Sequence, residues 1–179
     1  MLKKIVVIMA HPNMDESILN TRIKKELSGS ENIVYKDLTS LYSDFKIDIK
    51  KEQEDLSDAS KIVFQFPMQW YNSPSILKQY VDEVFSYDFA YEIDRNGVFQ
   101  DLALKDKEFQ LLVTIGSREK SFQGEGRLSA KECLNSYSYT AKMLGMKELE
   151  PCFFYGAVYD MYTEEDFLKM SQKLKEIIL

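Results

Sequence analysis

The fold is decided by the stretch Ile5-Val6-Val7-Ile8-Met9-Ala10. This run is short, continuous and rich in β-branched residues, which is typical of a strand that is buried on both faces of a parallel sheet. Similar runs recur at residues 62–66 and 109–115, and weaker ones at residues 32–36 and 152–155. The sequence therefore predicts five strands, the first of them in the middle of the sheet.

Helical patterns separate these runs. The most regular one begins at Ser73 and Pro74, where Ser73 is expected to be the N-cap and Pro74 the first helical residue. An apolar stripe then follows through residues 76–85. Thr163 and Asp166 have the spacing of a capping box, which predicts the start of a last helix.

Two more helices are expected over residues 17–27 and 127–144, the second ending at Gly145. Strands and helices thus alternate, and the crossovers between parallel strands are right-handed. We therefore expect an α/β fold: a three-layer sandwich with helices on both faces of a parallel sheet of order 2-1-3-4-5.

The composition excludes several classes of protein. A chain of 179 residues predicts a single domain over residues 1–179, large enough to fold without a metal or a disulfide, so Cys133 and Cys152 need not pair and no metal site is expected. The net charge of −6 disfavours a nucleic-acid partner. The first apolar run is far too short to cross a bilayer and lacks a cleavage signal, so we expect a cytoplasmic protein.

Ligands of open α/β sheets bind beyond the carboxyl ends of the strands, so the residues there are the candidate site. After the first predicted strand come His11 and then Ser17, Ile18, Leu19 and Asn20. A helix that begins here would point its first amides, with hydroxyl and amide side chains, at an anion, and the imidazole could donate one more hydrogen bond. The alternative is that Ser17 only caps its helix and His11 is an ordinary residue at a strand end.

The third predicted strand is followed by Pro67, Met68, Gln69, Trp70 and Tyr71. The prolines on either side confine these residues to a tight turn, which would present backbone amides and flat side chains to a polycyclic ring. The alternative is that the two aromatic side chains plug the top of the core.

The fourth predicted strand ends in Thr114, Ile115, Gly116 and Ser117. Glycine allows a ligand to approach the backbone closely, so this segment would form a second edge rich in amides. The alternative is an ordinary turn from a strand to a loop.

Together, a phosphate site after the first strand and a ring site after the third and fourth fit one elongated ligand, a mononucleotide flavin. The sequence contains neither G-x-G-x-x-G nor a P-loop, which argues against a dinucleotide fingerprint and against an ATPase.

One stretch carries a specific resemblance, Phe66-Pro67-Met68-Gln69-Trp70-Tyr71-Asn72-Ser73-Pro74-Ser75-Ile76-Leu77-Lys78. With His11-Pro12 and with Phe89-Ala90-Tyr91, it resembles the flavodoxin-like NAD(P)H:quinone oxidoreductase family over nearly the whole chain. The resemblance is to the short bacterial members, which include reductases of the modulator-of-drug-activity type and the ancillary subunits of potassium-efflux systems.

The resemblance implies a flavin cofactor, with NAD(P)H as co-substrate and a quinone-like acceptor reduced by hydride transfer in a ping-pong sequence. FMN is expected before FAD, because the C-terminal region that accommodates adenosine in long members is missing. The resemblance also implies that His11 and Ser17 to Asn20 hold the phosphate end of the flavin, and that Met68 to Tyr71 and Thr114 to Ser117 hold its ring. The flavin would carry the chemistry, so no catalytic side chain is expected.

The family also implies a homodimer in which the second subunit covers the ring. The expected substrate pocket comprises Trp70, Tyr71, Phe89, Tyr91 and Phe122, with the long connection around residues 89–98 as one wall. The alternative for this connection is a solvent-exposed hairpin or loop.

The chain departs from the family at three places. Phe122 stands where long members carry a tyrosine over the ring, residues 124–128 contain no histidine, and Ile115 replaces a usual threonine. Two rival functions share parts of the pattern. One is a flavin-binding ancillary subunit of a potassium-efflux transporter, and the other is an electron-carrying flavodoxin, whose phosphate loop rich in hydroxyl groups and glycine is absent here.

Overall fold

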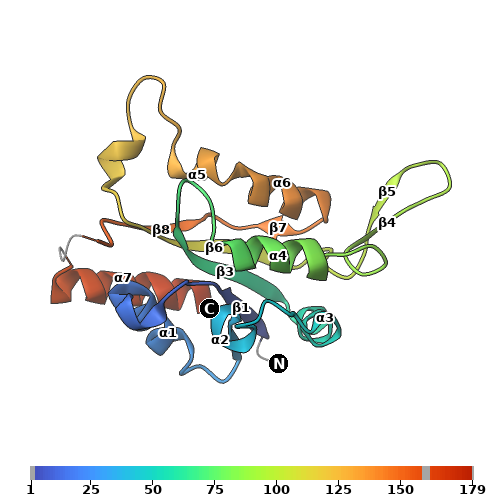
Figure 1. Cartoon of the computed structure of the whole chain (residues 1–179), viewed down its shortest axis with the longest axis horizontal. Coiled ribbons are helices and arrows are strands. Elements are labelled where there is room, and N and C mark those ends of the chain that lie inside the picture. The colour runs from blue at the N-terminus through green and yellow to red at the C-terminus, as the bar shows by residue number, and fades with distance from the viewer. Residues whose placement is uncertain (1–2, 159–161, 179) are drawn as a thin grey trace.

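Parallel strands form the central sheet in the computed structural model, which describes residues 3–158 and 162–178 (Figure 1). The strands of this sheet are β1 (Ile5–Met9), β2 (Ile33–Asp37), β3 (Lys61–Met68), β6 (Glu108–Ile115), β7 (Lys147–Glu148) and β8 (Cys152–Tyr155). They run in the order β2-β1-β3-β6, and the place beside β6 is shared by β7, which pairs with its start, and β8, which pairs with its end. The predicted order is confirmed, with β8 as the fifth predicted strand.

Helices cover both faces of this sheet. They are α1 (Ile18–Leu27), α2 (Leu38–Leu41), α3 (Ile49–Ser57), α4 (Ser75–Val84), α5 (Ala130–Cys133), α6 (Asn135–Met143) and α7 (Glu164–Ile178), with short 3₁₀ turns η1 (Met14–Glu16) and η2 (Glu119–Phe122). Helices α1 and α7 lie together on one face, and the other helices pack on the opposite face (Figure 1). Among the described helices, none has the length and apolar character that crossing a bilayer requires.

Each face of the sheet has its own apolar core. In β1, Val6 and Ile8 belong to the larger core under α2 to α6, whereas Ile5 and Val7 belong to the core under α1 and α7. All four side chains are at most 3% exposed. This double burial explains why the first strand is apolar at every position instead of alternating.

The start of α4 differs from the prediction. Pro74 is the N-cap, with φ −57° and ψ 149°, and the helix begins at Ser75. Ser73 does not cap the helix, because its hydroxyl lies 2.5 Å from the hydroxyl of Tyr137 in α6 and is used to join the two helices. The capping box of α7 is confirmed: the amide of Asp166 donates to Thr163 Oγ1, and the amide of Thr163 donates to the carboxylate of Asp166.

The helix expected over residues 127–144 is two helices. α5 begins only at Ala130, because Ser129 and Glu132 form a capping box at that point. Leu134, with φ −101° and ψ 13°, separates α5 from α6. Gly145 follows at φ 65°, the left-handed conformation expected of a glycine that ends a helix.

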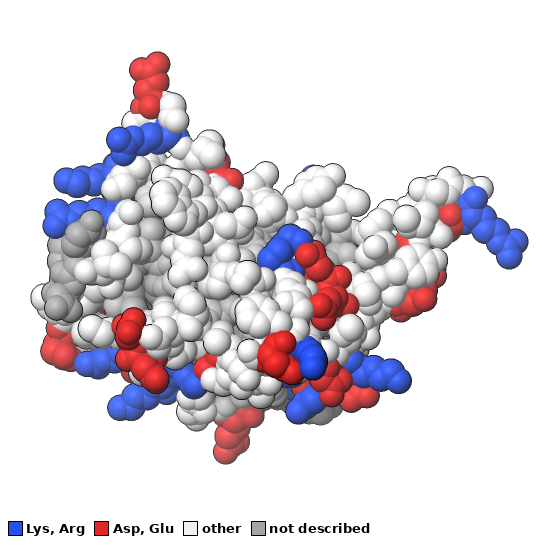
Figure 2. Space-filling view, viewed as in Figure 1, with Lys and Arg blue, Asp and Glu red and all other residues white. Residues whose placement is uncertain are grey.

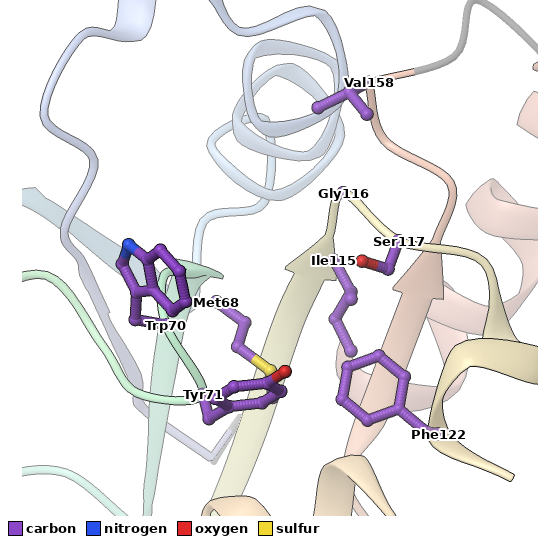
Figure 3. A pocket seen from close by; sticks show the side chains of 8 residues that line it. All are labelled: Met68, Trp70, Tyr71, Ile115, Gly116, Ser117, Phe122 and Val158. Atoms are coloured by element: carbon purple, nitrogen blue, oxygen red, sulfur yellow. The ribbon is translucent and has the colours of Figure 1, made fainter.

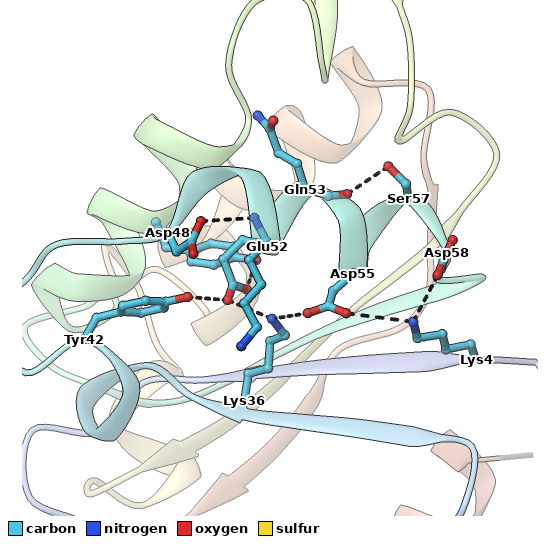
Figure 4. A network of polar contacts seen from close by, with 11 residues as sticks. Lys4, Lys36, Tyr42, Asp48, Glu52, Gln53, Asp55, Ser57 and Asp58 are labelled. Atoms are coloured by element: carbon cyan, nitrogen blue, oxygen red, sulfur yellow. Dashed lines mark hydrogen bonds and ion pairs between the residues drawn. The ribbon is translucent and has the colours of Figure 1, made fainter.

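A cluster of buried charges ties α3 to the sheet and to α4. Glu52 is fully buried, and its carboxylate accepts hydrogen bonds from Lys36 Nζ at 2.7 Å, Tyr42 at 2.6 Å and Tyr80 at 3.0 Å (Figure 4). Lys36 also pairs with Asp55 at 2.6 Å. Both buried charges of this cluster, Glu52 and Lys36, therefore have partners, which is the condition for tolerating charge in a core.

The long connection after α4 forms a β-hairpin, β4 (Tyr91–Ile93) and β5 (Phe99–Asp101), that projects from the body of the molecule (Figure 1 and Figure 2). Its strands are held by stacked rings of Tyr91 and Phe99, whose centroids are 5.0 Å apart. Ile93 and Val98 near its tip are each 51% exposed. The alternative of a solvent-exposed hairpin is therefore confirmed for the isolated chain.

Candidate functional site

A groove of about 440 Å³ lies at the carboxyl ends of β1, β3 and β6. It is lined by His11, Glu16, Ser17, Ile18, Leu19, Asn20, Pro67, Met68, Gln69, Thr114, Gly116, Ala157 and Val158. The predicted anion site and the predicted glycine edge are thus brought together, because neighbouring parallel strands end at the same edge of a sheet.

His11 is a neutral hydrogen-bond donor in this groove. The backbone amide of Asn13 donates to His11 Nδ1 at 3.1 Å, which places the imidazole hydrogen on Nε2. Partial burial lowers the pKa of His11, and a hydrogen bond with the backbone of Asn13 and the carboxylate of Asp37 oppose this effect in part. At neutral pH the ring therefore carries no charge and has one N–H to offer a ligand.

The start of α1 supplies further donors. Ser17 is the N-cap of α1, and its hydroxyl accepts from the amide of Asn20 at 3.3 Å. The capping alternative for Ser17 is confirmed, but the residue also lines the groove, so both interpretations hold. Ile18 and Leu19 belong to the first turn, whose amides have no acceptor within the helix. This end of the groove therefore favours an anion.

Trp70 and Tyr71 are the two central residues of a tight turn that contains no glycine. The amide of Gln69 donates to the carbonyl of Asn72 at 2.8 Å, and the amide of Asn72 donates back at 3.0 Å. Trp70 and Tyr71 between them have φ values of 46° and 64°, which is the type I′ turn that normally selects asparagine and glycine. Two bulky residues in this conformation mark backbone strain, which concentrates at functional sites.

The same turn leaves both rings uncovered. Trp70 is 93% exposed and Tyr71 is 59% exposed, so the alternative that they plug the top of the core is wrong. Such exposure of the only tryptophan is unusual unless a ligand or a partner covers it.

These rings border a second cavity, of about 330 Å³, next to the groove. It is lined by Met68, Trp70, Tyr71, Ile115, Gly116, Ser117, Phe122 and Val158 (Figure 3). Tyr71 and Phe122 face each other with ring centroids 6.3 Å apart. Because Met68, Gly116 and Val158 line both spaces, the groove and the cavity form one elongated site. We call this the composite site.

Every residue predicted to bind the cofactor lines the composite site, but three lining residues were not predicted. Glu16 lies in η1, between His11 and Ser17. Ala157 and Val158 follow β8, and the amide of Ala157 donates to the carbonyl of Ile115 at 2.9 Å. Residues 156–158, directly after this strand, have no polar side chain that would have indicated a site, but the position of the strand in the sheet could have indicated it.

Phe89 and Tyr91 do not join the other predicted pocket residues within one chain. They follow the C-terminal end of α4, whereas Trp70 and Tyr71 precede its start, so the helix separates the two pairs. Neither lines the composite site. Within one chain Phe89 and Tyr91 therefore stand apart from Trp70, because the hairpin points away from the ends of the strands (Figure 1). That they border the pocket of a homodimer stays a prediction.

A third cavity, of about 590 Å³, adjoins the composite site through Tyr71 and Phe122. Its other lining residues are Ser121, Gly126, Arg127, Leu128, Glu132 and Cys133. Arg127 is held at its rim by a hydrogen bond of 3.0 Å from Nη1 to the carbonyl of Ser121. The aromatic end of the composite site thus opens toward further space that could admit a second molecule.

The chain is similar to known proteins along nearly its whole length. The model of a family described as having a flavodoxin-like fold matches residues 3–178. General stress protein 14 of Bacillus subtilis is 38% identical over 177 residues, which cover 98% of this chain and 97% of the relative. A Bacillus subtilis protein named as an uncharacterized NAD(P)H oxidoreductase, YrkL, is 33% identical with the same coverage.

Two further comparisons bear on the site. The potassium-efflux ancillary protein KefF of Enterobacter sp. strain 638 is 37% identical over 147 residues, which cover 82% of this chain and 80% of the relative. The crystal structure of general stress protein 14 from Treponema denticola, in complex with FMN, superposes with a TM-score of 0.85 at 26% identity, covering 98% of this chain and 97% of that one. The flavodoxin-like resemblance read from the residues is confirmed by the family match.

Proposed function

The chain belongs to the flavodoxin-like family, and on this premise we propose that it is an FMN-dependent NAD(P)H oxidoreductase that reduces quinones or similar flat aromatic acceptors. One observation carries the proposal: a groove rich in hydrogen-bond donors runs without interruption into a cavity walled by aromatic rings. The similarity to YrkL supports the NAD(P)H oxidoreductase activity, and the similarity to the FMN complex from Treponema denticola supports the cofactor.

The donor set of the groove fits a phosphate monoester. His11 Nε2–H and the first-turn amides of Ile18 and Leu19 would surround the phosphate, which needs donors and a positive helix end. Glu16 is the one acidic side chain that lines this groove, and it is exposed to solvent, which screens its charge. FMN ends in such a phosphate, whereas FAD would carry its adenosine half beyond it.

The ring end fits a flat heterocycle. The amides of the turn at Trp70 and Tyr71 would face one edge of the ring, and the backbone of Gly116 and Ser117 would face another. Donors placed where negative charge develops stabilise a reduced ring electrostatically. When bound, FMN supplies the hydride and two-electron chemistry of this reaction class.

The two substrates would use one cavity in turn. Tyr71 and Phe122 border the aromatic end of the composite site, where both substrates would have to approach the same cofactor ring. NAD(P)H would therefore leave before the acceptor enters, which is the ping-pong order. His11 is the only histidine of the chain and serves the phosphate end, so protons for the acceptor would come from solvent at the exposed rim around Trp70.

We propose that a second copy of the chain completes the cavity. Trp70 and two apolar residues that flank the polar tip of the hairpin, Ile93 and Val98, are uncovered in the isolated chain. If the hairpin of one subunit reaches the composite site of the other, Phe89 and Tyr91 regain the role expected for them. Sedimentation equilibrium should give a dimer mass, and a monomer at micromolar concentration would contradict this arrangement.

The decisive experiment for the activity is cofactor identification followed by turnover. The purified protein should be yellow, release FMN on denaturation with the mass and spectrum of that flavin, and oxidise NADPH or NADH when a soluble quinone is added. A colourless protein that takes up neither FMN nor FAD on titration would refute the proposal.

The variant His11→Ala separates binding from chemistry. Loss of the Nε2–H donor should weaken FMN retention about ten-fold or more, since a hydrogen bond to a charged group contributes about 1.5–3 kcal/mol. Hydride transfer by the variant saturated with FMN should change little. Unchanged retention with slower turnover would show that His11 does not hold the phosphate.

A second candidate function is that of an ancillary subunit of a potassium-efflux transporter. The similarity to KefF favours it, and the composite site is compatible with it because the flavin would be retained. Co-purification with membranes that contain such a transporter would support this role. Full quinone reductase activity together with no membrane association would leave the free enzyme as the function.

A further inference from the structure

A buried chain of hydrogen bonds runs beneath the groove. Tyr35 donates to Gln65 Oε1 at 2.8 Å, and Gln65 Nε2 donates to Asn20 Oδ1 at 3.2 Å. Asn20 Nδ2 in turn donates to Ser17 Oγ at 3.1 Å and to Thr114 Oγ1 at 3.0 Å. Gln65 is fully buried, and Asn20 and Thr114 are each 2% exposed, so water does not compete for these bonds.

The direction of this chain is fixed at Gln65. Its Nε2 lies 3.5 Å from the backbone carbonyl of Asn20 as well as 3.2 Å from Asn20 Oδ1. If the Gln65 amide were reversed, its oxygen would face that backbone carbonyl, which can only accept. Gln65 must therefore donate toward Asn20, and Asn20 must turn its oxygen to Gln65 and its NH₂ group to the hydroxyls.

This direction decides what the hydroxyls can offer. Asn20 Nδ2 donates its two hydrogens to the hydroxyl groups of Ser17 and Thr114, so each hydroxyl oxygen accepts a hydrogen bond from the protein interior. Ser17 Oγ accepts a second bond, from the amide of Asn20. Each hydroxyl keeps its own hydrogen for the groove that it lines. Were Asn20 reversed, both hydroxyls would donate inward and present lone pairs instead.

We propose that Gln65 is a positioning residue that, through Asn20, makes the groove select a terminal phosphate over a terminal hydroxyl. The inference rests on the proposed function. A phosphate monoester offers only acceptors once both protons are lost, so it matches hydroxyl hydrogens, amides and His11 Nε2–H. The terminal hydroxyl of riboflavin carries a hydrogen that these donors cannot accept. The predicted ligand class is thus FMN in preference to riboflavin.

The first test compares the two flavins on the apoprotein. FMN and riboflavin are titrated against wild-type protein and Gln65→Met, with flavin fluorescence as the signal. Releasing Asn20 should reduce the ratio of the two affinities about ten-fold, because FMN loses directed donors that riboflavin uses less. Gln110→Met is the matched control: Gln110 is also a strand glutamine bonded to a backbone carbonyl, that of Glu150, but it lies outside the groove. It should leave the ratio unchanged.

Tyr35→Phe sharpens the test. Because the backbone carbonyl of Asn20 orients Gln65, removal of the Tyr35 hydroxyl should lower stability yet leave the affinity ratio within about two-fold of wild type. An unchanged ratio in Gln65→Met would overturn the inference while leaving the proposed function intact. Failure of the wild type to bind either flavin would instead overturn the proposed function.

A measurement on the wild type does not depend on how the variants fold. The phosphorus NMR shift of bound FMN should stay at the dianion value from pH 8 to about pH 5.5, whereas that of free FMN titrates near pH 6. A wall of donors stabilises the unprotonated phosphate. A bound phosphate that titrates at or above the pH of the free one would show that the hydroxyls present lone pairs, and would refute the proposed direction.

Discussion

Replacing Trp70 with asparagine should make the apoprotein more stable and its binding of FMN weaker. Trp70 has φ 46° in the type I′ turn, and a left-handed conformation costs an L-residue roughly 1–2 kcal/mol. Asparagine adopts this conformation with much less strain. The substitution should therefore relieve about 1 kcal/mol or somewhat more.

The lost packing is small by comparison. Trp70 is 93% exposed, so the side chain buries only about 20 Å², which corresponds to about 0.5 kcal/mol. The net gain is about 0.5–1 kcal/mol, and the Tm should rise by about 1–4 °C for a chain of this size. Removal of the ring from the rim of the composite site should weaken FMN binding about three- to ten-fold, the contribution of one aromatic contact.

Thermal unfolding of the apoprotein and fluorescence titration with FMN measure the two effects. Trp70→Ala is the matched control, because alanine also lacks the ring but keeps the strain of a left-handed residue. It should lose affinity as Trp70→Asn does without gaining stability. Equal Tm values for the two variants would refute the strain argument, and unchanged FMN affinity in both would refute the placement of Trp70 beside the cofactor.

Three other perturbations test separate parts of the structure. Burial lowers the pKa of His11, so the unfolded chain takes up this proton at higher pH than the folded chain does. The contribution of His11 to the free energy of unfolding of the apoprotein should therefore be fully present above about pH 6.5 and be lost as the pH falls through the folded pKa. In urea titrations across pH 5–8, His11→Ala should lack this pH-dependent part of the free energy of unfolding. Glu16→Gln should tighten FMN binding by less than about 1 kcal/mol, because it removes a screened negative charge from the groove. The effect should be larger at low salt. Weaker FMN binding by this variant would contradict the anion site. Lys36→Met should cost about 3–5 kcal/mol of unfolding free energy because it leaves the Glu52 carboxylate buried without its cation, whereas Lys3→Met, which removes an exposed pair, should cost less than about 0.5 kcal/mol.

The strands could be predicted because residues that are buried on both faces of a sheet form a continuous apolar run, and their order follows the pattern of doubly wound sheets. Ile5 and Val7 face one core and Val6 and Ile8 face the other, so a strand at the centre is apolar throughout. The residues predicted to bind the cofactor could be placed at one edge for a related reason: they lie in the last two residues of a strand or in the segment that follows it, and parallel strands end at the same edge of a sheet.

Local details were less predictable where a side chain has a distant partner. Ser73 has the sequence of an N-cap, but Tyr137, 64 positions along the chain, engages its hydroxyl. The expected helix over residues 127–144 has continuous periodicity, but the capping box at Ser129 and the turn at Leu134 divide and shorten it. Propensity ranks local alternatives, and tertiary contacts choose among them.

The sequence by itself determined that strands alternate with helices, that a donor-rich segment follows the first strand, and that aromatic residues follow the third. Only the tertiary structure decided that Trp70 is exposed and not packed in the core, that Phe89 and Tyr91 lie away from it in one chain, and that Gln65 orients Asn20. The physical reason is the distance along the chain between the residues that interact. Burial patterns and caps depend on neighbours along the chain, whereas exposure, cavities and the direction of a buried amide depend on which distant atoms the fold brings within hydrogen-bond distance.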